Sequence, residues 1–364
     1  MTDPGRRVLT RVGLCIPGWI ATQSTSSDAS SSEWEGTGNR PEGDEHEHEH
    51  EHEHRTGHSQ RFDRLAEIAT TAERSGFDSV WVTDNAGDGR EPSGRAPGFE
   101  PYAAGFEPYT VLGALATRTQ TVTLGAMVSP ITARNPAVLA KIVTGVDVLS
   151  GGRAALGVGM GAPGSSITGK ESAGGHEPAP PHPPAPPHPS HPPPPPSEMP
   201  GGSQRVDRAS RLDILAEGLR ICRALFTEEA PTFEGTYYRI DDAHNRPRPV
   251  RAGGIPILVG GGEEGVLELV ARYADAVTVA GGVATVRDRL TTLDRLCDEV
   301  DRDPATISRI SAGTLVMTAS AQSVADQVGE LLEVGIDGVV CTMSDAQDLE
   351  LVELAGATLR SLFG

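Results

Sequence analysis

Short apolar segments alternate with amphipathic helical patterns along most of the chain, and glycine follows several of the apolar segments directly. An apolar segment of about four to eight residues bounded by glycine, proline or polar residues is typical of a buried strand. Eight candidate strands are found, each followed by a helical pattern: residues 11–17, 79–83, 122–128, 154–161, 256–259, 276–280, 310–317 and 337–342. This alternation predicts an α/β fold with a parallel sheet, and eight units predict a (β/α)8 TIM barrel.

Helical periodicity supports the elements between these strands. Apolar side chains recur at helical spacing from Phe62 to Ala72, and Gly76 is placed to end that helix. Asn135 followed by Pro136 indicates a helix start, because proline is favoured in the first turn. We therefore expect one barrel domain over residues 8–364.

Two segments interrupt this pattern. Residues 21–58 are rich in Ser, Thr, Gly and Glu and end in a Glu-His alternation, and residues 162–204 are dominated by proline and histidine. Neither has enough apolar surface to offset the entropy of ordering the chain, so both are predicted to be disordered inserts. Each follows a strand and precedes a helix, which places both at the carboxyl-terminal mouth of the barrel, where active sites of this fold lie.

Charge and apolar length exclude some classes of partner. The formal net charge is −19, and residues 21–58 contribute −8 of it, from ten Asp and Glu against two Arg. No stripe of Lys and Arg occurs along the chain, which argues against a nucleic-acid partner. Because no apolar run is long enough to span a bilayer and no signal-peptide core is present, we expect no membrane partner and a cytoplasmic location.

Four cysteines stand far apart and without the spacing of a metal site: Cys15, Cys222, Cys297 and Cys341. Each falls in an apolar strand or on an apolar helix face, so buried free thiols in a reducing compartment are expected.

Glycine clusters end the fifth and sixth predicted strands, with Gly260, Gly261 and Gly262 after the fifth and Gly281 and Gly282 after the sixth. Glycine lets backbone N–H groups approach an anion, and the N-terminus of the next helix adds positive potential, so these turns could bind a phosphate. Tight turns without a ligand are the alternative. Glu263 and Glu264 follow the first cluster and would repel an anion unless both point to solvent.

Two acidic residues are candidates for catalysis at the mouth. Asp84 ends the second predicted strand, and Glu107 begins the next helix. A carboxylate at either place can hold a substrate or a cofactor ring, or it can cap a helix.

Histidine is concentrated in the inserts. Ten of the eleven histidines lie there and only His244 lies elsewhere, so neither a histidine base nor a metal site is expected in the barrel. The Glu-His alternation could bind Zn, Ni or Cu, or it could be a solvated segment without a metal function.

Several strings of residues, read together, resemble the luciferase-like monooxygenase superfamily, and most closely its branch that depends on the deazaflavin coenzyme F420. They include LAEIATTAERSGFDSVWVTD (residues 65–84), RNPAVLAK (residues 134–141) and DVLSGGRAALGVG (residues 147–159). The resemblance covers most of the chain outside the two inserts. It implies a TIM barrel that binds a reduced flavin or deazaflavin at its mouth.

The resemblance also implies roles for particular residues. The third strand would carry a bulge with a non-prolyl cis peptide at Met127-Val128, and the cofactor ring would lie against the segment made of Ala126, Met127, Val128 and Ser129. The exit of the fourth strand, Gly159 and Gly161, would line the ring pocket, and the two glycine clusters described above would bind phosphate.

This chain departs from the family at the expected catalytic positions. Many relatives have Asp-His after the second strand, whereas this chain has Asp84 followed by Asn85, whose amide can hydrogen-bond but cannot carry a proton at neutral pH. Asp84, Asn85 and Glu107 are the expected catalytic residues. The string Ala162-Pro163-Gly164 and the proline-rich insert replace the usual polar and aromatic residues after strand four.

The sequence therefore favours an F420-dependent oxidoreductase that transfers a hydride between the deazaflavin and a small organic substrate, because the cofactor supplies the chemistry and the protein its orientation. An FMN-dependent monooxygenase is the first alternative. A non-catalytic barrel that binds a cofactor or a metal is the second. Relatives often form homodimers, so a homodimer is the assembly that the resemblance suggests.

Overall fold

The computed structural model describes residues 9–16, 62–84, 106–161, 207–314, 321–342 and 348–363. Its nine main strands form one parallel sheet in the order β3-β2-β1-β11-β10-β9-β8-β5-β4, and a further β3–β5 pairing closes the sheet into a barrel. These strands are β1 (Val12–Ile16), β2 (Ser79–Val82), β3 (Thr123–Ala126), β4 (Ser129–Pro130), β5 (Ala154–Gly159), β8 (Ile257–Gly260), β9 (Ala276–Val279), β10 (Ser308–Thr314) and β11 (Gly338–Thr342).

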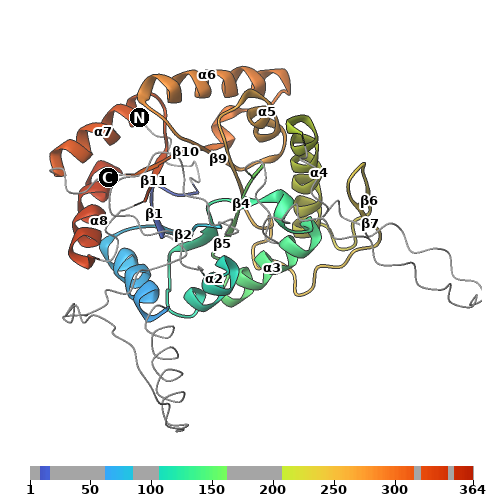
Figure 1. Ribbon diagram of the computed structural model, residues 1–364, viewed down its shortest axis with the longest axis horizontal. Coiled ribbons are helices and arrows are strands. Elements are labelled where there is room, and N and C mark those ends of the chain that lie inside the picture. Colours follow the sequence, from blue (N-terminus) through green and yellow to red (C-terminus); the bar gives the residue numbers. More distant parts are fainter. Residues whose placement is uncertain are drawn as a thin grey trace, which may run out of the picture.

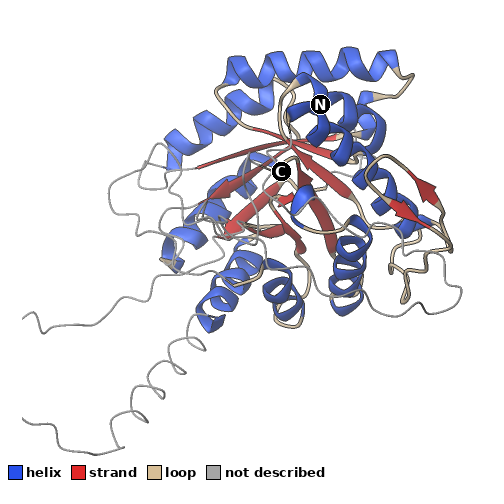
Figure 2. Ribbon diagram, turned by 45° about the vertical axis from the view of Figure 1, so that its right-hand side comes forward, coloured by secondary structure: helices blue, strands red, loops and turns tan. Residues whose placement is uncertain are grey.

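Helices surround the strands on all sides (Figures 1 and 2). They comprise a helix at residues 62–75, α2 (Pro108–Ala116), α3 (Pro136–Leu149), α4 (Arg208–Thr227), α5 (Glu264–Tyr273), α6 (Val283–Glu299), α7 (Ala321–Glu333) and α8 (Leu349–Phe363), with short 3-10 turns η1 (Ile131–Ala133) and η2 (Pro304–Thr306). The strands β3 and β4 are successive parts of the third strand of the barrel wall, and both pair with β5. Counted as one, they give the barrel the eight strands that the sequence predicts.

Two details differ from the sequence prediction. The strand β10 begins at Ser308, before the predicted start, because its pairing with β9 includes the polar residues Ser308 and Arg309. A small antiparallel hairpin of β6 (Phe233–Glu234) and β7 (Arg239–Ile240) lies between α4 and β8 and was not predicted, since its strands are two residues long.

The inside of the barrel is filled by side chains, with Trp81 the largest of them. The inner cluster consists of Cys15, Trp81, Ala155, Leu258, Ala276, Ile310 and Val340. Trp81 is fully buried and donates a hydrogen bond from Nε1 to Ser79 Oγ at 2.8 Å. A Cβ atom at Gly125 would lie 2.5 Å from the indole ring, so glycine on the neighbouring strand provides the space that Trp81 occupies.

The third wall strand contains the bulge that the resemblance implies. Gly125 pairs with Ala155 and Ser129 with Val158, so four steps along this strand face three along β5. The peptide bond between Met127 and Val128 inside the bulge is cis, which confirms that prediction.

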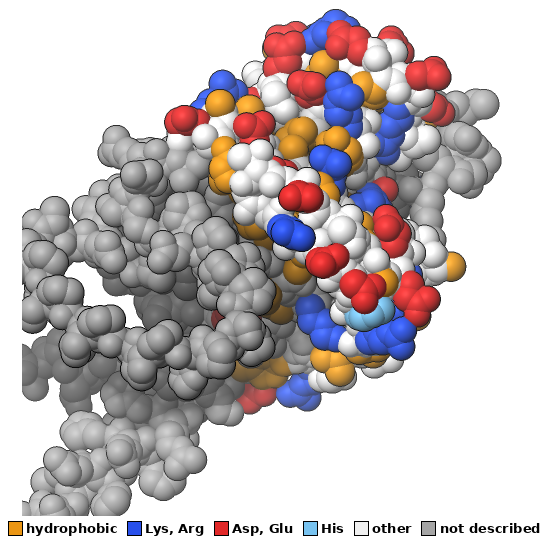
Figure 3. Space-filling model, turned by 90° about the vertical axis from the view of Figure 1, so that its right-hand side faces the viewer, with side chains coloured by type: hydrophobic (Ala, Val, Ile, Leu, Met, Phe, Trp, Pro, Cys, Tyr) orange, Lys and Arg blue, Asp and Glu red, His pale blue; other side chains and the backbone are white. Residues whose placement is uncertain are grey.

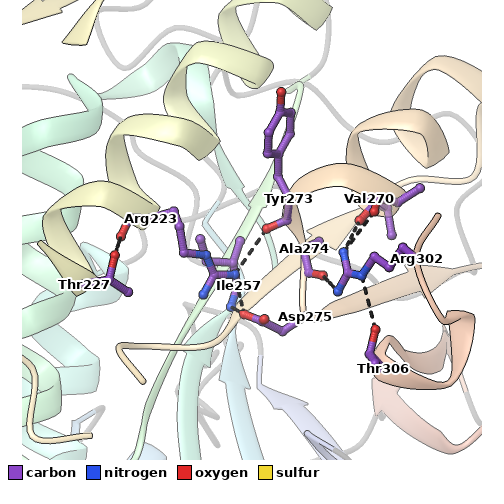
Figure 4. Close-up of polar contacts among 10 residues, drawn as sticks. Arg223, Thr227, Ile257, Val270, Tyr273, Ala274, Asp275, Arg302 and Thr306 are labelled. Carbon is purple, nitrogen blue, oxygen red and sulfur yellow. Dashed lines mark hydrogen bonds and ion pairs between the residues drawn. The ribbon is translucent and has the colours of Figure 1, made fainter. Parts of the chain in front are cut away.

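Arginine side chains secure the amino-terminal end of the barrel around β8 and β9 (Figure 4). Arg302 donates hydrogen bonds to the carbonyl oxygens of Val270, Ala271 and Ala274 at the end of α5. Arg223 of α4 forms an ion pair with Asp275 at 2.6 Å, and the same Asp275 oxygen accepts from the N–H of Ile257. The hydrogen bonds from Arg302 satisfy helix-end carbonyls that would otherwise lack partners, and the bonds to Asp275 join α4 to the start of β8.

The β6–β7 hairpin is held against α4 by a buried carboxylate. Glu217 accepts hydrogen bonds from the backbone N–H groups of Thr236, Tyr237 and Tyr238 at 2.6, 3.0 and 2.9 Å.

On this side of the molecule, acidic and basic side chains are interspersed over the surface (Figure 3).

Three further predictions from the sequence can be compared with the described residues. All four cysteines are free and buried, as predicted. Among the described residues, no helix is long and apolar enough to cross a membrane. The segments 21–58 and 162–204 follow β1 and β5 in the chain, but their residues lie outside the described part, so their disorder and their place at the mouth stay predictions.

Candidate active site

The bulge of the third strand forms an apolar floor at the mouth of the barrel. Met127 and Val128 are partly buried and pack on the inner cluster below them. A Cβ at Gly159 or at Gly260 would lie 2.9 Å from a methyl group of Val128, so the glycines of β5 and β8 let the bulge approach both strands. The arrangement offers a flat group an apolar support.

Two glycine turns lie beside this floor, on neighbouring strands. Gly261 and Gly281 have φ angles of +141° and +123°, a region that favours glycine. The helices that follow, α5 and α6, have Glu263 and Gly282 as N-cap residues, and neither makes a side-chain capping hydrogen bond. No capping side chain therefore occupies the first backbone N–H groups of either helix. An anion site at a helix N-terminus requires such N–H groups.

The glutamates beside the first turn do not oppose an anion there. Glu263 is paired with Arg208 at 2.6 Å and Glu264 is paired with Arg295, and all four side chains are at least half exposed. Both carboxylates thus point to solvent and are neutralised by arginine, the condition under which the phosphate prediction holds.

A further arginine lies between the two glycine turns. Arg289 of α6 donates a hydrogen bond to the carbonyl oxygen of Ala280, and a Cβ at Gly262 would overlap its guanidinium. It adds a positive charge beside both helix N-termini. Nothing in the sequence predicts this position of Arg289, because the spacing of residues in α6 does not show that its seventh residue lies against Gly262, in the turn before α5.

The two predicted catalytic carboxylates share one arginine. Arg134 donates to Asp84 Oδ2 at 2.6 Å and Oδ1 at 3.4 Å, and its Nη2 also donates to Glu107 Oε1 at 2.9 Å. The side chain of Asp84 is 2 % exposed, that of Arg134 12 % and that of Glu107 46 %. Glu107 is also the N-cap of α2, where it accepts from the N–H of Thr110 at 2.7 Å.

Two buried polar groups complete this cluster. The guanidinium of Arg134 lies 5.3 Å from the centre of the Tyr109 ring, and the Tyr109 hydroxyl is 2.7 Å from Ser129 Oγ. Burial raises the pKa of Tyr109, so its hydroxyl stays protonated. Burial by itself would lower the pKa of Arg134, but the hydrogen bond and charge of Asp84 outweigh it and raise that pKa.

The structure places the remaining predicted site residues as follows. Ala126 belongs to the outer core between strands and helices, so its side chain faces away from the mouth. Ser129 is fully buried and bonds to Tyr109 instead of facing the mouth openly. Gly161 has a φ angle of +73°, and its carbonyl oxygen accepts from Arg211 at 2.9 Å. Asn85 lies outside the described residues.

The barrel, the bulged third strand and the paired glycine turns define a TIM barrel with a candidate cofactor site at its mouth, and the comparison of sequences places it in a family. The profile of the luciferase-like monooxygenase family matches residues 45–182 and 192–358. The chain belongs to this family.

Curated relatives carry the name F420-dependent glucose-6-phosphate dehydrogenase. The protein of Nakamurella multipartita is 31 % identical over 239 residues, which are 65 % of this chain and 58 % of the relative. The protein of Kineococcus radiotolerans is 31 % identical over 220 residues, 60 % of this chain and 52 % of the relative. The matched part thus spans less than two thirds of these relatives.

Solved structures share the fold at low sequence identity. An F420-dependent secondary alcohol dehydrogenase has a TM-score of 0.66 at 14 % identity, over 97 % of this chain and 99 % of its own. The F420-dependent tetrahydromethanopterin reductase of Methanopyrus kandleri has a TM-score of 0.63 at 15 % identity, over 84 % of this chain and 96 % of its own. Both confirm the predicted barrel.

Proposed function

We propose that this protein is an F420-dependent oxidoreductase that transfers a hydride between the deazaflavin and a small organic substrate. The observation that carries the proposal is the apolar bulge at Met127 and Val128, which lies beside two glycine turns whose helices have no side-chain cap. The names of the two curated relatives described above, both F420-dependent glucose-6-phosphate dehydrogenases, support the same cofactor.

The residues present fit such a cofactor. The turns at residues 260–262 and 281–282 would hold a phosphate through backbone N–H groups, with Arg289 adding its charge. Met127 and Val128 would support the ring from below. When bound, F420 supplies the carbon that accepts or releases the hydride, and the protein orients it.

Both carboxylates that the sequence predicts to be catalytic are engaged by one arginine in the structure. Because Asp84 and Glu107 are bonded to Arg134, we propose that they act through it, as supports of the site. Asn85, which follows Asp84 in the chain, is then the candidate to hydrogen-bond the substrate through its amide.

Titration with oxidised F420 and, separately, with FMN tests the proposal. In a Gly282→Asp variant the new side chain meets open space and caps α6, so stability is kept while the anion loses its N–H donors. We expect F420 to bind and this variant to weaken binding at least about tenfold, or about 1.4 kcal/mol. Gly253→Asp, also in open space but before β8, is the matched control and should bind as the wild type does.

The outcome separates the alternatives. Binding of FMN alone, with oxygen consumption by the reduced form, would replace the proposal with a monooxygenase. Binding of neither cofactor would contradict it and favour a non-catalytic barrel. If F420 binds, glucose 6-phosphate and small secondary alcohols, the substrates named for proteins similar to this one, are the first compounds to assay.

A further inference from the structure

One guanidinium joins three elements at the mouth. Arg134 stands between η1 and α3, and it reaches Asp84 after β2 and Glu107 at the start of α2. Its planar fork of donors serves two carboxylates simultaneously, which a lysine ammonium could not do with the same geometry. The ends of these elements are therefore fixed relative to one another.

The same cluster extends to the bulge through Tyr109. The tyrosine ring lies beneath the Arg134 guanidinium, and its hydroxyl is bonded to Ser129, the residue next to Val128. Tyr109 is 5 % exposed and Ser129 is fully buried, so water cannot readily replace this bond. On the other side, Val128 is packed against the glycines of β5 and β8.

We propose that Arg134, Tyr109 and Ser129 are positioning residues that set the backbone of the bulge, and thereby the orientation of the cofactor ring resting on it. This inference depends on the proposed function, because it assumes that the ring lies on Met127 and Val128. Asp84 and Glu107 take part by holding Arg134. None of these groups needs to touch the reacting atoms, since misplacing a reactant by about 1 Å is enough to slow a reaction strongly.

Removal of the tyrosine hydroxyl is the least disruptive test. Tyr109→Phe keeps the ring beneath Arg134 and leaves only the Ser129 hydroxyl unpaired. Tyr238→Phe is the matched control, because Tyr238 is also buried but lies at the β6–β7 hairpin. We expect Tyr109→Phe, and not the control, to speed hydrogen exchange of the amides in residues 123–131.

The cofactor itself supplies the second readout. With oxidised F420 bound, we expect Tyr109→Phe to reduce or shift the visible circular-dichroism band, while the dissociation constant changes by less than about threefold because the phosphate turns are untouched. Unchanged exchange and an unchanged band would overturn the inference. If the wild type binds no F420, the proposed function fails first, and a change confined to hydrogen exchange would reduce the cluster to a structural one.

The double variant Tyr109→Phe with Ser129→Ala separates positioning from stability. Replacing both partners leaves no unpaired hydroxyl, so the midpoint of unfolding should recover toward that of the wild type. The bond to the bulge is still missing, so the altered dichroism of bound F420 should persist. Recovery of the dichroism together with stability would overturn the inference.

Discussion

The interior of the barrel depends on the size of single side chains. Trp81 fills it, and Gly125 on the adjacent strand leaves room for the ring. A Cβ at Gly157 would lie 2.0 Å from the carbonyl oxygen of Ala126. Because barrel interiors are packed as densely as crystals, added atoms at such positions have no free volume to enter.

Gly125→Ala should therefore lower the free energy of unfolding by about 1–3 kcal/mol, the usual cost of overpacking. Gly145→Ala in α3 is the control, since its new methyl group meets nothing within 4 Å, and it should instead stabilise the helix by about 0.5–1 kcal/mol. Urea unfolding monitored by tryptophan fluorescence, to which Trp81 contributes with Trp19 and Trp34, measures both. Equal effects of the two changes would contradict the account of Trp81.

Glu73, in the helix at residues 62–75, makes the stability of the fold depend on pH through its hydrogen bonds to residues 120–122. Glu73 accepts from the N–H groups of Gln120 and Val122, and from the N–H and hydroxyl of Thr121, at 2.5–3.1 Å. Burial raises its pKa, but these hydrogen bonds outweigh burial and hold the pKa below its ordinary value of 4.5.

Since the folded pKa of Glu73 is the lower one, its contribution to stability is present above pH 4.5 and is lost as the pH falls toward the folded pKa. Glu73→Gln should thus destabilise by about 1 kcal/mol at pH 7, with solvent exposure limiting the loss. The difference from the wild type should shrink below pH 4.5. Urea midpoints at several pH values test this, with Glu67→Gln on the same helix as control. A constant difference would refute it.

Among the elements, the β6–β7 hairpin is too short to be stable alone. Its two strands have two residues each, and the three N–H groups of its turn are satisfied by Glu217 of α4. The cation of Arg220 on the same helix lies 4.7 Å from the centre of the Phe233 ring. The helix α4 thus provides what the hairpin lacks.

Glu217→Gln should loosen the hairpin, because the new amide group faces N–H donors with a donor of its own. We expect a loss of about 1–3 kcal/mol in local stability. Hydrogen exchange of residues 233–240 should speed up by at least about tenfold, while that of β8 changes little. Asp213→Asn, an exposed acid on the same helix, is the control. Unchanged exchange in Glu217→Gln would show that the carboxylate is not the anchor.

At the scale of the whole molecule, the barrel closes entirely through pairings among described residues. The pairing of β1 with β11 and of β3 with β5 completes the ring without any contribution from residues 162–204. That segment joins β5 to α4, elements that are already fixed by their neighbours.

Replacing these 43 residues by about ten Gly and Ser residues should therefore leave the fold intact. A shorter loop has a smaller entropic cost of closure, so the free energy of unfolding should rise by about 1 kcal/mol. Thermal unfolding and F420 titration of the shortened chain test this. A clear loss of stability would show that the segment packs on the barrel, contrary to the prediction of disorder.

Most strands and helices of the barrel could be predicted from local patterns in the sequence. The runs around Trp81 and Ile257 have the length and punctuation of buried strands, and Gly261 and Gly281 mark turns that follow them. These signals depend on residues close in sequence, and periodicity reports them directly. The cis bond at Met127 was implied by resemblance alone, because no spacing of apolar residues specifies it.

The sequence by itself determined the alternation of strands and helices, the family and the turns that suit a phosphate. Only the tertiary structure decided that Arg134 holds Asp84, 50 residues away, and Glu107, 27 residues away, so that both predicted catalytic carboxylates are engaged. It likewise placed Arg289 against the glycine turns. The physical reason is that local spacing fixes which face of an element a side chain occupies, whereas its partner is fixed only when the barrel closes and brings distant elements together.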